Sequence, residues 1–386
     1  MFFKNALVYS EDFTFRRGGF GVENGRFICV GEERDDAVDL GGARVIPGLI
    51  DVHTHGNSGA DFSDGELDGL AKMARYEAKN GITSFAPASL TLSYDTLDKA
   101  FKTALQVKRE AHPDAARIVG INMEGPFFSE KKKGAQNPQY LRKPDFDAFE
   151  KLYNACEGLI RIVDIAPELD GAEEFIRKAS KLCTVSIAHT DCDYEDARRA
   201  IDAGVTQLTH LFNAMPPLHH RKPGPIGAAA EDSRVRAELI CDGLHVHPSV
   251  VRLAFALFGA ERMVMISDSL RCCGMPDGDY ILGEQPVHLS GGVARLSDGT
   301  IAGSASNLFM CLKKTISFGI APEDAIKAAT YNPACSVGAE DIVGSISDGK
   351  FADFLVCDDD YNLREVYLGG NVISATPHNT SAASDG

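Results

Sequence analysis

Eight apolar, strand-like runs that alternate with amphipathic helical patterns predict an α/β protein built as a (β/α)8 TIM barrel. Short alternating β segments open the chain and return near its end, which predicts a small β-sandwich domain built from both termini. We therefore expect a discontinuous small domain at 1–47 and 344–375, a barrel at 48–343, and a frayed tail at 376–386.

The sequence pattern changes along the chain from short β segments, to strand-like runs alternating with helical ones, and back to β segments. Residues 1–47 are short alternating segments interrupted by Gly and Asn, which is typical of β structure. The predicted barrel strands are, in chain order, VIPGLIDV, GITSFAP, RIVGINM, IRIVDIAP, CTVSIA, VTQLT, VRAELICD and RMVMIS. Helical patterns such as ELDGLAKMARYEAKN and YEDARRAIDAG lie between most of them. Two hairpin strands joined by SGG and two helical stretches, NLFMCLKKTIS and EDAIKAAT, then precede the return to β texture at Gly344.

The composition describes a folded, acidic protein. The chain has 386 residues, with 39 Lys+Arg against 55 Asp+Glu and a formal net charge of −16, and 44% of its residues are hydrophobic. The charge argues against nucleic acid or an anionic membrane as the main partner, and the apolar content excludes a disordered chain. The first residues lack the apolar core of a secretory signal, and no window approaches the roughly 18 apolar residues of a membrane span.

The ten cysteines do not form a disulfide or zinc pattern, because no C-x-x-C pair occurs among them. This usage predicts a reducing, cytoplasmic compartment in which most thiols pack as small apolar groups. Cys272 and Cys273 are adjacent, and packing is the interpretation that we prefer there over a redox role.

Metal-capable or acid/base side chains follow five of the predicted strands, at the strand ends where barrel active sites are built. In chain order they are His53, His55, Glu124, His189, His210 and Asp268. One histidine at a strand end is more often a surface residue than a ligand, but six such residues on one rim favour a metal centre. Imidazole and carboxylate ligands suit Zn, Fe(II) or Mn better than Mg or Ca.

The number of these candidate ligands bears on the number of ions. Side chains alternate along a strand, so His53 and His55 point to the same site. Four histidines and two carboxylates exceed what one tetrahedral ion needs, and two ions that share Glu124 are the economical interpretation. We expect one or two divalent ions.

Several segments resemble the amidohydrolase superfamily and, within it, the family that deacetylates N-acetylglucosamine 6-phosphate. They are PGLIDVHTHG, MEGPFFSEKKKGAQNP, AHTD, THLFNAM, CDGLHVHP, ISDS and GSISDGKFADFLV, and the resemblance covers about residues 1–373. It implies a barrel with a β-sandwich, and a metal-dependent hydrolase that gives glucosamine 6-phosphate and acetate in amino-sugar catabolism. The H-x-H pair implies the two-metal type, and family members form homodimers.

Amide hydrolysis needs an activated water and a proton for the leaving amine. A metal-bound water ionises near pH 7, at about nine pKa units below bulk water. Asp268 is placed to accept the water proton and return it to the sugar amine, as general base and then general acid. A turn or helix-capping role for Asp268 is the structural alternative.

Two basic loops, 131–133 and 219–222, stand out against the acidic background and could attract a sugar phosphate. A solvated surface is an equally good interpretation of the lysines. The resemblance implies substrate contacts from Ala135, Gln136, Asn213, Ala214, Arg221, Asp242, Gly243, Leu244, His245, Ile301, Ala302 and Gly303. It also implies that Arg221 and His245 reach a neighbouring subunit.

The chain departs from the family pattern at one substrate position. Gln136 stands where many members carry a histidine, and a glutamine amide can donate a hydrogen bond but cannot carry a proton. The substrate therefore stays open to another N-acyl sugar phosphate, an N-acyl amino acid or a cyclic amide. A sugar-phosphate-binding barrel without turnover is the non-enzymatic alternative.

Overall fold

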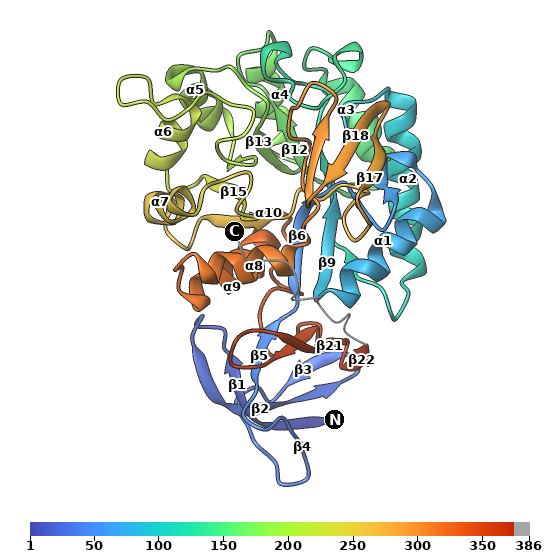
Figure 1. The fold of residues 1–386 in the computed structure, drawn as a ribbon, viewed down its shortest axis with the longest axis vertical. Coiled ribbons are helices and arrows are strands. Elements are labelled where there is room, and N and C mark those ends of the chain that lie inside the picture. The colour runs from blue at the N-terminus through green and yellow to red at the C-terminus, as the bar shows by residue number, and fades with distance from the viewer. Residues whose placement is uncertain (374–386) are drawn as a thin grey trace.

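The computed structural model describes residues 1–373, so the predicted tail 376–386 lies outside the described part. Figure 1 shows a β region built from both ends of the chain beside a larger α/β region. The N-terminal strands and the last strands of the described chain lie together in the smaller region, as the sequence predicts.

Both termini contribute to one mixed sheet of eight strands. Its strand order is β22-β21-β20-β5-β1-β2-β3, and β4 pairs with β1. The strands are β1 (Phe2–Tyr9), β2 (Phe15–Glu23), β3 (Arg26–Ile28), β4 (Val38–Asp39), β5 (Arg44–Pro47), β20 (Phe354–Cys357), β21 (Leu363–Leu368) and β22 (Asn371–Ile373). Because β5 pairs with β20, residues more than 300 positions apart share a ladder. Its own core is aromatic: Phe354 and Tyr367 stack with ring centroids 4.2 Å apart, and Phe3 packs edge-on to both.

The larger region has parallel strands in two ladders, in the orders β10-β9-β6 and β11-β12-β13-β14-β15-β16. The strands are β6 (Leu49–Thr54), β9 (Ile82–Pro87), β10 (Arg117–Ile118), β11 (Ile121–Met123), β12 (Ile160–Ile165), β13 (Thr184–Ile187), β14 (Gln207–Leu208), β15 (Arg236–Ile240) and β16 (Met263–Ile266). Each predicted run contains at least one of them. The first run divides at Gly48 between β5 and β6, where a Cβ would lie 2.0 Å from the Thr83 hydroxyl oxygen.

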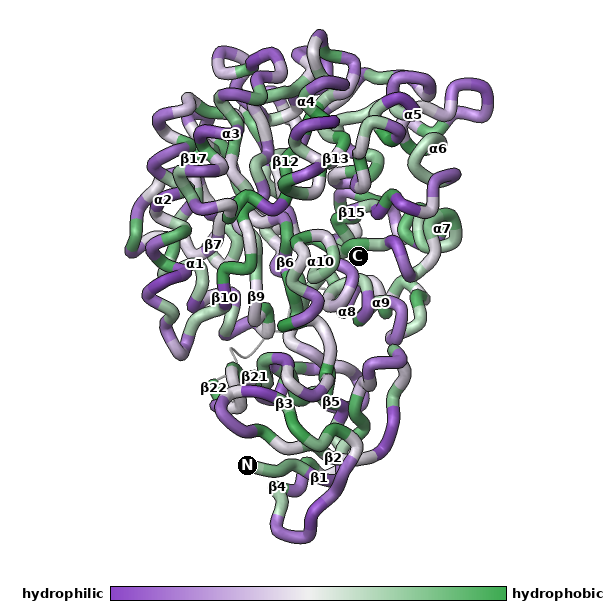
Figure 2. Tube along the Cα trace, turned by 180° about the vertical axis from the view of Figure 1, so that it is seen from behind, coloured by the Kyte–Doolittle hydropathy of each residue, from purple (hydrophilic) through white to green (hydrophobic). Residues whose placement is uncertain are grey.

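Helices cover the strands and follow the predicted alternation. They are α1 (Leu67–Lys79), α2 (Tyr94–Glu110), α3 (Phe146–Ala155), α4 (Ala172–Ala179), α5 (Tyr194–Ala203), α6 (Gly224–Glu231), α7 (Pro248–Phe258), α8 (Leu308–Ser317), α9 (Pro322–Ala329) and α10 (Tyr331–Ser336). In α1 the buried side chains include Leu70, Met73 and Ala74, which recur at helical spacing. Figure 2 shows hydrophobic and hydrophilic colouring mixed along the inner strands, and hydrophilic colouring on many outer turns. Burial of that apolar stripe fixes each helix against the strands.

A three-stranded antiparallel sheet follows the last parallel strand. It consists of β17 (Gly278–Leu282), β18 (Gln285–Ser290) and β19 (Val293–Leu296), in that order. The sequence predicts two strands here, joined by SGG, and the structure adds β17 through a tight turn at Gly283–Glu284. Five short pieces lie elsewhere in the described chain: β7 (Gly56–Asn57), β8 (Ala60–Asp61) and the 3-10 turns Phe62–Asp64, Glu130–Lys132 and Pro138–Tyr140.

The structure bears on the predicted state of the cysteines and on the predicted absence of a membrane-spanning segment. All ten cysteines are free, and Cys272 and Cys273 are buried, with the Cys273 sulfur 3.5 Å from the Tyr76 hydroxyl. Among residues 1–373, no helix is both long and apolar enough to cross a bilayer.

Candidate metal centre

The six predicted ligands lie at or just beyond the C-terminal ends of five parallel strands. His53 lies in β6 and His55 one residue after it, Glu124 follows β11, and Asp268 follows β16. His189 and His210 follow β13 and β14. All six are buried, and the structure brings all six together.

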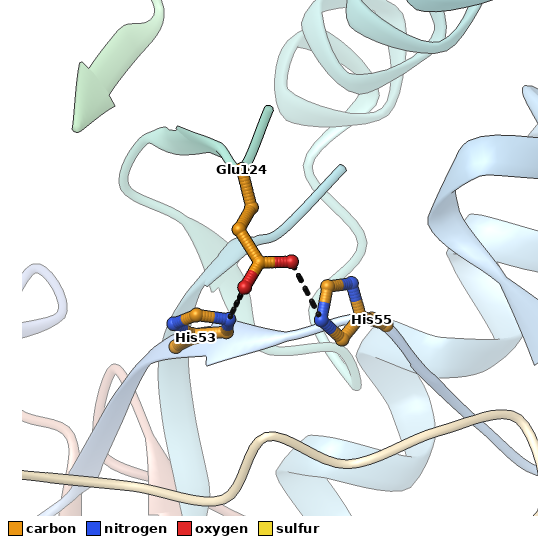
Figure 3. Close-up of side chains that lie close together, drawn as sticks. All are labelled: His53, His55 and Glu124. Carbon is orange, nitrogen blue, oxygen red and sulfur yellow. Dashed lines mark ion pairs between the residues drawn. The ribbon is translucent and has the colours of Figure 1, made fainter. Parts of the chain in front are cut away.

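Glu124 is the centre of the cluster. Its Oε1 lies 3.4 Å from His53 Nε2 and 3.3 Å from Nε2 of both His189 and His210. Its Oε2 lies 3.4 Å from His55 Nε2, so the two oxygens address different histidines, as Figure 3 shows for His53 and His55. One carboxylate therefore connects two groups of ligand atoms, one with His53 and His55 and one with His189 and His210.

The opposite ring nitrogens hold the histidines in place. His53 Nδ1 lies 3.0 Å from Glu238 Oε2, His55 Nδ1 lies 3.1 Å from the Ala88 carbonyl, and His189 Nδ1 lies 2.9 Å from the Lys132 carbonyl. All three partners are acceptors, so Nδ1 carries a hydrogen, and Nε2 of each ring presents a lone pair to the centre when the ring is neutral, as it is when it binds a metal. Metal-ligating histidines are oriented in this way by their outer partners.

The chemistry of this donor set fits a divalent cation. His53 Nε2 is buried without a hydrogen-bond partner, and Nε2 of His189 and His210 face each other at 3.2 Å. Lone pairs and carboxylate oxygens gathered in a buried space repel one another unless positive charge lies between them. Imidazole nitrogens with carboxylate oxygens are ligands of a borderline divalent ion.

The charges of the centre are strongly coupled. Burial alone would lower the pKa of His53, but the charges of Glu238 and Glu124 outweigh it and hold that pKa well above its ordinary value. Burial would raise the pKa of Glu124, yet the His53 charge and hydrogen bonds from His189 and His210 hold it well below its usual range. The carboxylates thus attract positive charge to this position.

Asp268 lies on the His55 side of the centre. Its Oδ1 is 3.2 Å from His55 Nε2 and 3.8 Å from His53 Nε2. Burial opposes its ionisation, but the His55 hydrogen bond and the charge of His53 outweigh it and lower the pKa of this carboxyl. Asp268 is therefore an ionised acceptor, the state that a general base needs.

Several residues of this rim have left-handed backbones. His189, His210 and Asp268 have φ values of 44°, 28° and 49°, and Ala214 has a φ of 51°. Non-glycine residues rarely adopt this conformation, and such strain concentrates at functional sites. Here the sharp turns bring side chains at the strand ends into one space.

One residue of the centre escapes the sequence analysis. Glu238 lies inside β15 and is fully buried, and its Oε2 accepts from His53 Nδ1 while its Oε1 accepts from the Gln207 side chain at 2.6 Å. The available signal is a carboxylate within the otherwise apolar run VRAELICD, because Glu is almost never fully buried without a partner.

Some of the predicted substrate residues lie next to the candidate ligands in the chain or contact them directly. Asn213 and Ala214 belong to the turn after His210: the Asn213 amide donates to the His210 carbonyl, and the Ala214 carbonyl accepts from Thr190. Gln136 is buried and donates to Glu124 Oε2 at 2.6 Å, and the neighbouring Ala135 is half-buried.

The turn 242–245 is held by its own acid. Asp242 accepts from the backbone of Leu244 and His245 and lies 2.8 Å from His245 Nδ1. Burial lowers the pKa of His245, but Asp242 outweighs it and the Asp268 charge adds to the rise, so this ring lies within the field of the centre. Gly243 forms the left-handed bend, and Leu244 is 48% exposed.

Residues 301–303 run beside the Asp268 loop. The Asp268 carbonyl accepts from the Ser304 backbone, and a Cβ on Gly303 would lie 2.8 Å from that carbonyl, so only glycine fits. Ile301 and Ala302 connect this contact to β19. Arg221 differs: it is exposed, and within residues 1–373 its side chain makes no hydrogen bond or ion pair. Of the predicted basic loops, Lys131 is exposed and pairs with Asp191.

Comparison with known proteins identifies the family. Residues 44–373 match the Amidohydrolase family. An N-acetylglucosamine-6-phosphate deacetylase of Vibrio furnissii is 35% identical over 91% of this chain and 89% of its own length. An N-acetylgalactosamine-6-phosphate deacetylase of Escherichia coli O157:H7 is 34% identical over 86% and 88%. A crystal structure of N-acetyl-D-glucosamine-6-phosphate deacetylase from Mycobacterium smegmatis superposes with a TM-score of 0.90 at 33% identity, over 97% of this chain and 100% of the other. The chain belongs to the amidohydrolase family, in the group that contains the amino-sugar-6-phosphate deacetylases.

Proposed function

We propose that this protein is a metal-dependent N-acetylglucosamine-6-phosphate deacetylase, which hydrolyses the N-acetyl group to give glucosamine 6-phosphate and acetate in amino-sugar catabolism. The observation that carries the proposal is the cluster of four histidines around Glu124 with Asp268 beside it. The relatives at 34–35% identity that act on N-acetylated amino-sugar 6-phosphates support it.

The protein's residues divide the work of amide hydrolysis. A divalent ion at this centre would supply a water of lowered pKa and polarise the acetyl carbonyl. Asp268, ionised and 3.2 Å from His55, takes the proton of the attacking water and returns it to the sugar nitrogen as the C–N bond breaks. The turn 213–214 and the turn 242–245 contact the sugar phosphate, and the buried centre excludes bulk water from the reacting atoms.

The ligand set supports one or two ions of Zn, Fe(II) or Mn. His53, His55 and Glu124 form one group of ligand atoms, and Glu124, His189 and His210 form the other. In each group, all ligand atoms lie within 4.8 Å of one another. Two ions would account for both groups, since Glu124 belongs to each of them, and Asp268 would be a further ligand on the His55 side.

The finer architecture belongs to the same proposal. The two parallel ladders form one (β/α)8 barrel at 48–343, since a bridge joins Ala88 to Asn122 between them, and the Asp268 amide donates to the His53 carbonyl at the other seam. The terminal sheet at 1–47 and 344–373 closes on its aromatic core as a β-sandwich, supported by the bridge between Arg26 and Phe351.

We also propose that the protein is a homodimer and that it works in the cytoplasm. The guanidinium of Arg221 is exposed and has no partner among residues 1–373, which suits the phosphate of a substrate in a neighbouring subunit and makes a homodimer the functional form. Ten free cysteines, seven of them buried, suit the reducing cytoplasm.

The direct test is release of a free amine from N-acetylglucosamine 6-phosphate by the purified protein. We expect activity that a chelator abolishes and that added divalent metal restores, and a loss of at least about 100-fold in kcat for Asp268→Asn when it is assayed at the same metal loading as the wild type. Full activity of Asp268→Asn would contradict the mechanism. Absence of amine release by the metal-loaded protein would contradict the function.

A second substrate has its own support in the Escherichia coli relative, which acts on the galactose epimer. Assays of N-acetylgalactosamine 6-phosphate beside the glucose epimer would rank the two by kcat/KM. Arg221→Ala is expected to raise KM for either phosphorylated sugar and to leave metal content unchanged, which distinguishes a phosphate substrate from an N-acyl amino acid or a cyclic amide.

A further inference from the structure

Gln136 is held at both ends of its amide inside the centre. It lies between β11 and α3, is 6% exposed, and makes two hydrogen bonds: the Thr91 backbone N–H donates to its Oε1 at 2.8 Å, and its Nε2 donates to Glu124 Oε2 at 2.6 Å. The backbone N–H of Thr91 can only donate, and an ionised carboxylate can only accept. These two partners therefore permit one orientation of the amide.

The hydrogen bond from Gln136 goes to Oε2 of Glu124 and not to Oε1. Oε1 faces three ring nitrogens, whereas Oε2 faces only that of His55. Within residues 1–373, Gln136 is the one side chain other than histidine that hydrogen-bonds this carboxylate. The terminal torsion of a glutamate is broad and weakly restrained, so an added donor decides which way the oxygens point.

The loop that carries Gln136 is itself fixed from outside. Glu284, at the β17–β18 turn, accepts from Asn137, Gln139 and Tyr140. Gln285 donates to the carbonyl of Ala135, the residue before Gln136. The amide thus reaches Glu124 from a rigid support, as a positioning group requires.

We propose that Gln136 is a positioning residue: by holding Oε2 of Glu124 toward His55, it sets the affinity of the centre for the ion on the His53/His55 side and has little influence on the side of His189 and His210. The inference rests on the proposed two-ion centre and deepens it. Outer partners of metal ligands act in this way, and their loss costs about 10- to 100-fold in metal affinity.

The test is a Co(II) titration of the metal-free full-length protein, followed by calorimetry and by cobalt absorption. His55→Ala and His189→Ala identify which of the two binding steps belongs to which side. Gln136→Met keeps the length of the side chain and removes both hydrogen bonds. We expect it to weaken the step lost in His55→Ala by about 10- to 100-fold and to leave the other step within about threefold.

Three further variants separate positioning from general damage. Gln136→His retains an N–H donor and is expected to bind both ions within about threefold of the wild type. Gln106→Met makes the same substitution at an exposed glutamine of α2 that contacts Glu110 instead of Glu124, and should bind as the wild type does. Gln136→Asn keeps the amide but is too short for both contacts, and replaces Gln136→Met if that variant fails to fold.

Specific outcomes overturn the inference. They are two unchanged steps in Gln136→Met, an equal loss on the His189 side, or a wild-type protein that binds a single ion. Metal binding is measured without substrate, so a normal titration with no amine release would refute the proposed activity and leave the role of Gln136 standing.

Discussion

At the residue scale, the candidate ligands at the strand ends are easier to predict from the sequence than the side chains that hydrogen-bond them. The six side chains that cluster around Glu124 could be singled out because polar residues at strand ends stand out against the apolar runs that precede them. Glu238 could not, since it lies inside a strand and its meaning depends on which residue it faces. Gln136 was predicted as a substrate contact, and the structure places its amide on Glu124.

The support of His53 leads to a prediction for Glu238→Gln. Gln207 donates to Oε1, so a glutamine at 238 keeps its oxygen there and turns its NH2 toward His53 Nδ1. A donor at that position favours the other tautomer of His53, with the hydrogen on Nε2 facing the centre. We expect metal affinity to fall by about 10- to 100-fold, measured by competition with a chromophoric chelator.

The comparison for that variant is Glu231→Gln, which changes an exposed glutamate that accepts from Tyr194. It should bind metal as the wild type does. Equal metal affinities for Glu238→Gln and Glu231→Gln would show that the contact with His53 does not orient the ring.

At the element scale, periodic segments could be predicted and the loops between them could not. The parallel strands and helices such as α1 and α5 carry their own apolar pattern, so the sequence places them within a few residues. The hairpin shows the limit: SGG marks the β18–β19 turn, but the edge strand β17 has alternating exposed positions and no distinct signal. The contact between Glu284 of the β17–β18 turn and the loop after β11 depends on tertiary structure alone.

That contact leads to a prediction for Glu284→Ala. The substitution removes the acceptor of three side chains, Asn137, Gln139 and Tyr140, from the loop that carries Ala135 and Gln136. A looser loop should reduce kcat/KM by about threefold to tenfold, mainly through KM, because these exposed hydrogen bonds are each modest. Steady-state kinetics with N-acetylglucosamine 6-phosphate measures it. Asp279→Ala, at an exposed position of β17 that contacts His288, should leave both constants unchanged; an equal loss there would contradict a specific role of Glu284.

At the scale of the whole molecule, the net charge of the chain does not describe the charge at its individual sites. A net charge of −16 disfavours polyanionic partners, yet the buried centre gathers four histidines, and Arg221 is exposed and unpaired within the described chain. The similar texture of the two termini predicts one shared sheet, but the pairing of β5 with β20 and its register could not be predicted, because the paired residues lie over 300 positions apart.

The stability of the whole molecule should depend on pH through a buried carboxyl that is not among the candidate metal ligands. Glu77 of α1 is 1% exposed, with Oε1 accepting from Asn57 and Oε2 without a partner. Burial, and then the charge of Asp51, raise the pKa of Glu77 well above its ordinary value. The folded state therefore holds a proton that the unfolded chain releases, and folding loses stability as pH rises above the unfolded pKa of Glu77.

Glu77→Gln removes this proton while keeping an oxygen for Asn57. We expect its free energy of unfolding to exceed that of the wild type by more at pH 8 than at pH 5, because the penalty removed by the substitution grows with pH. Urea unfolding of the metal-free proteins at several pH values measures the difference. Asp68→Asn, an exposed position of the same helix, should show an offset that does not change with pH. A pH-independent offset for Glu77→Gln as well would mean that Glu77 is already charged in the folded protein at pH 5, and would contradict a buried proton on this carboxyl.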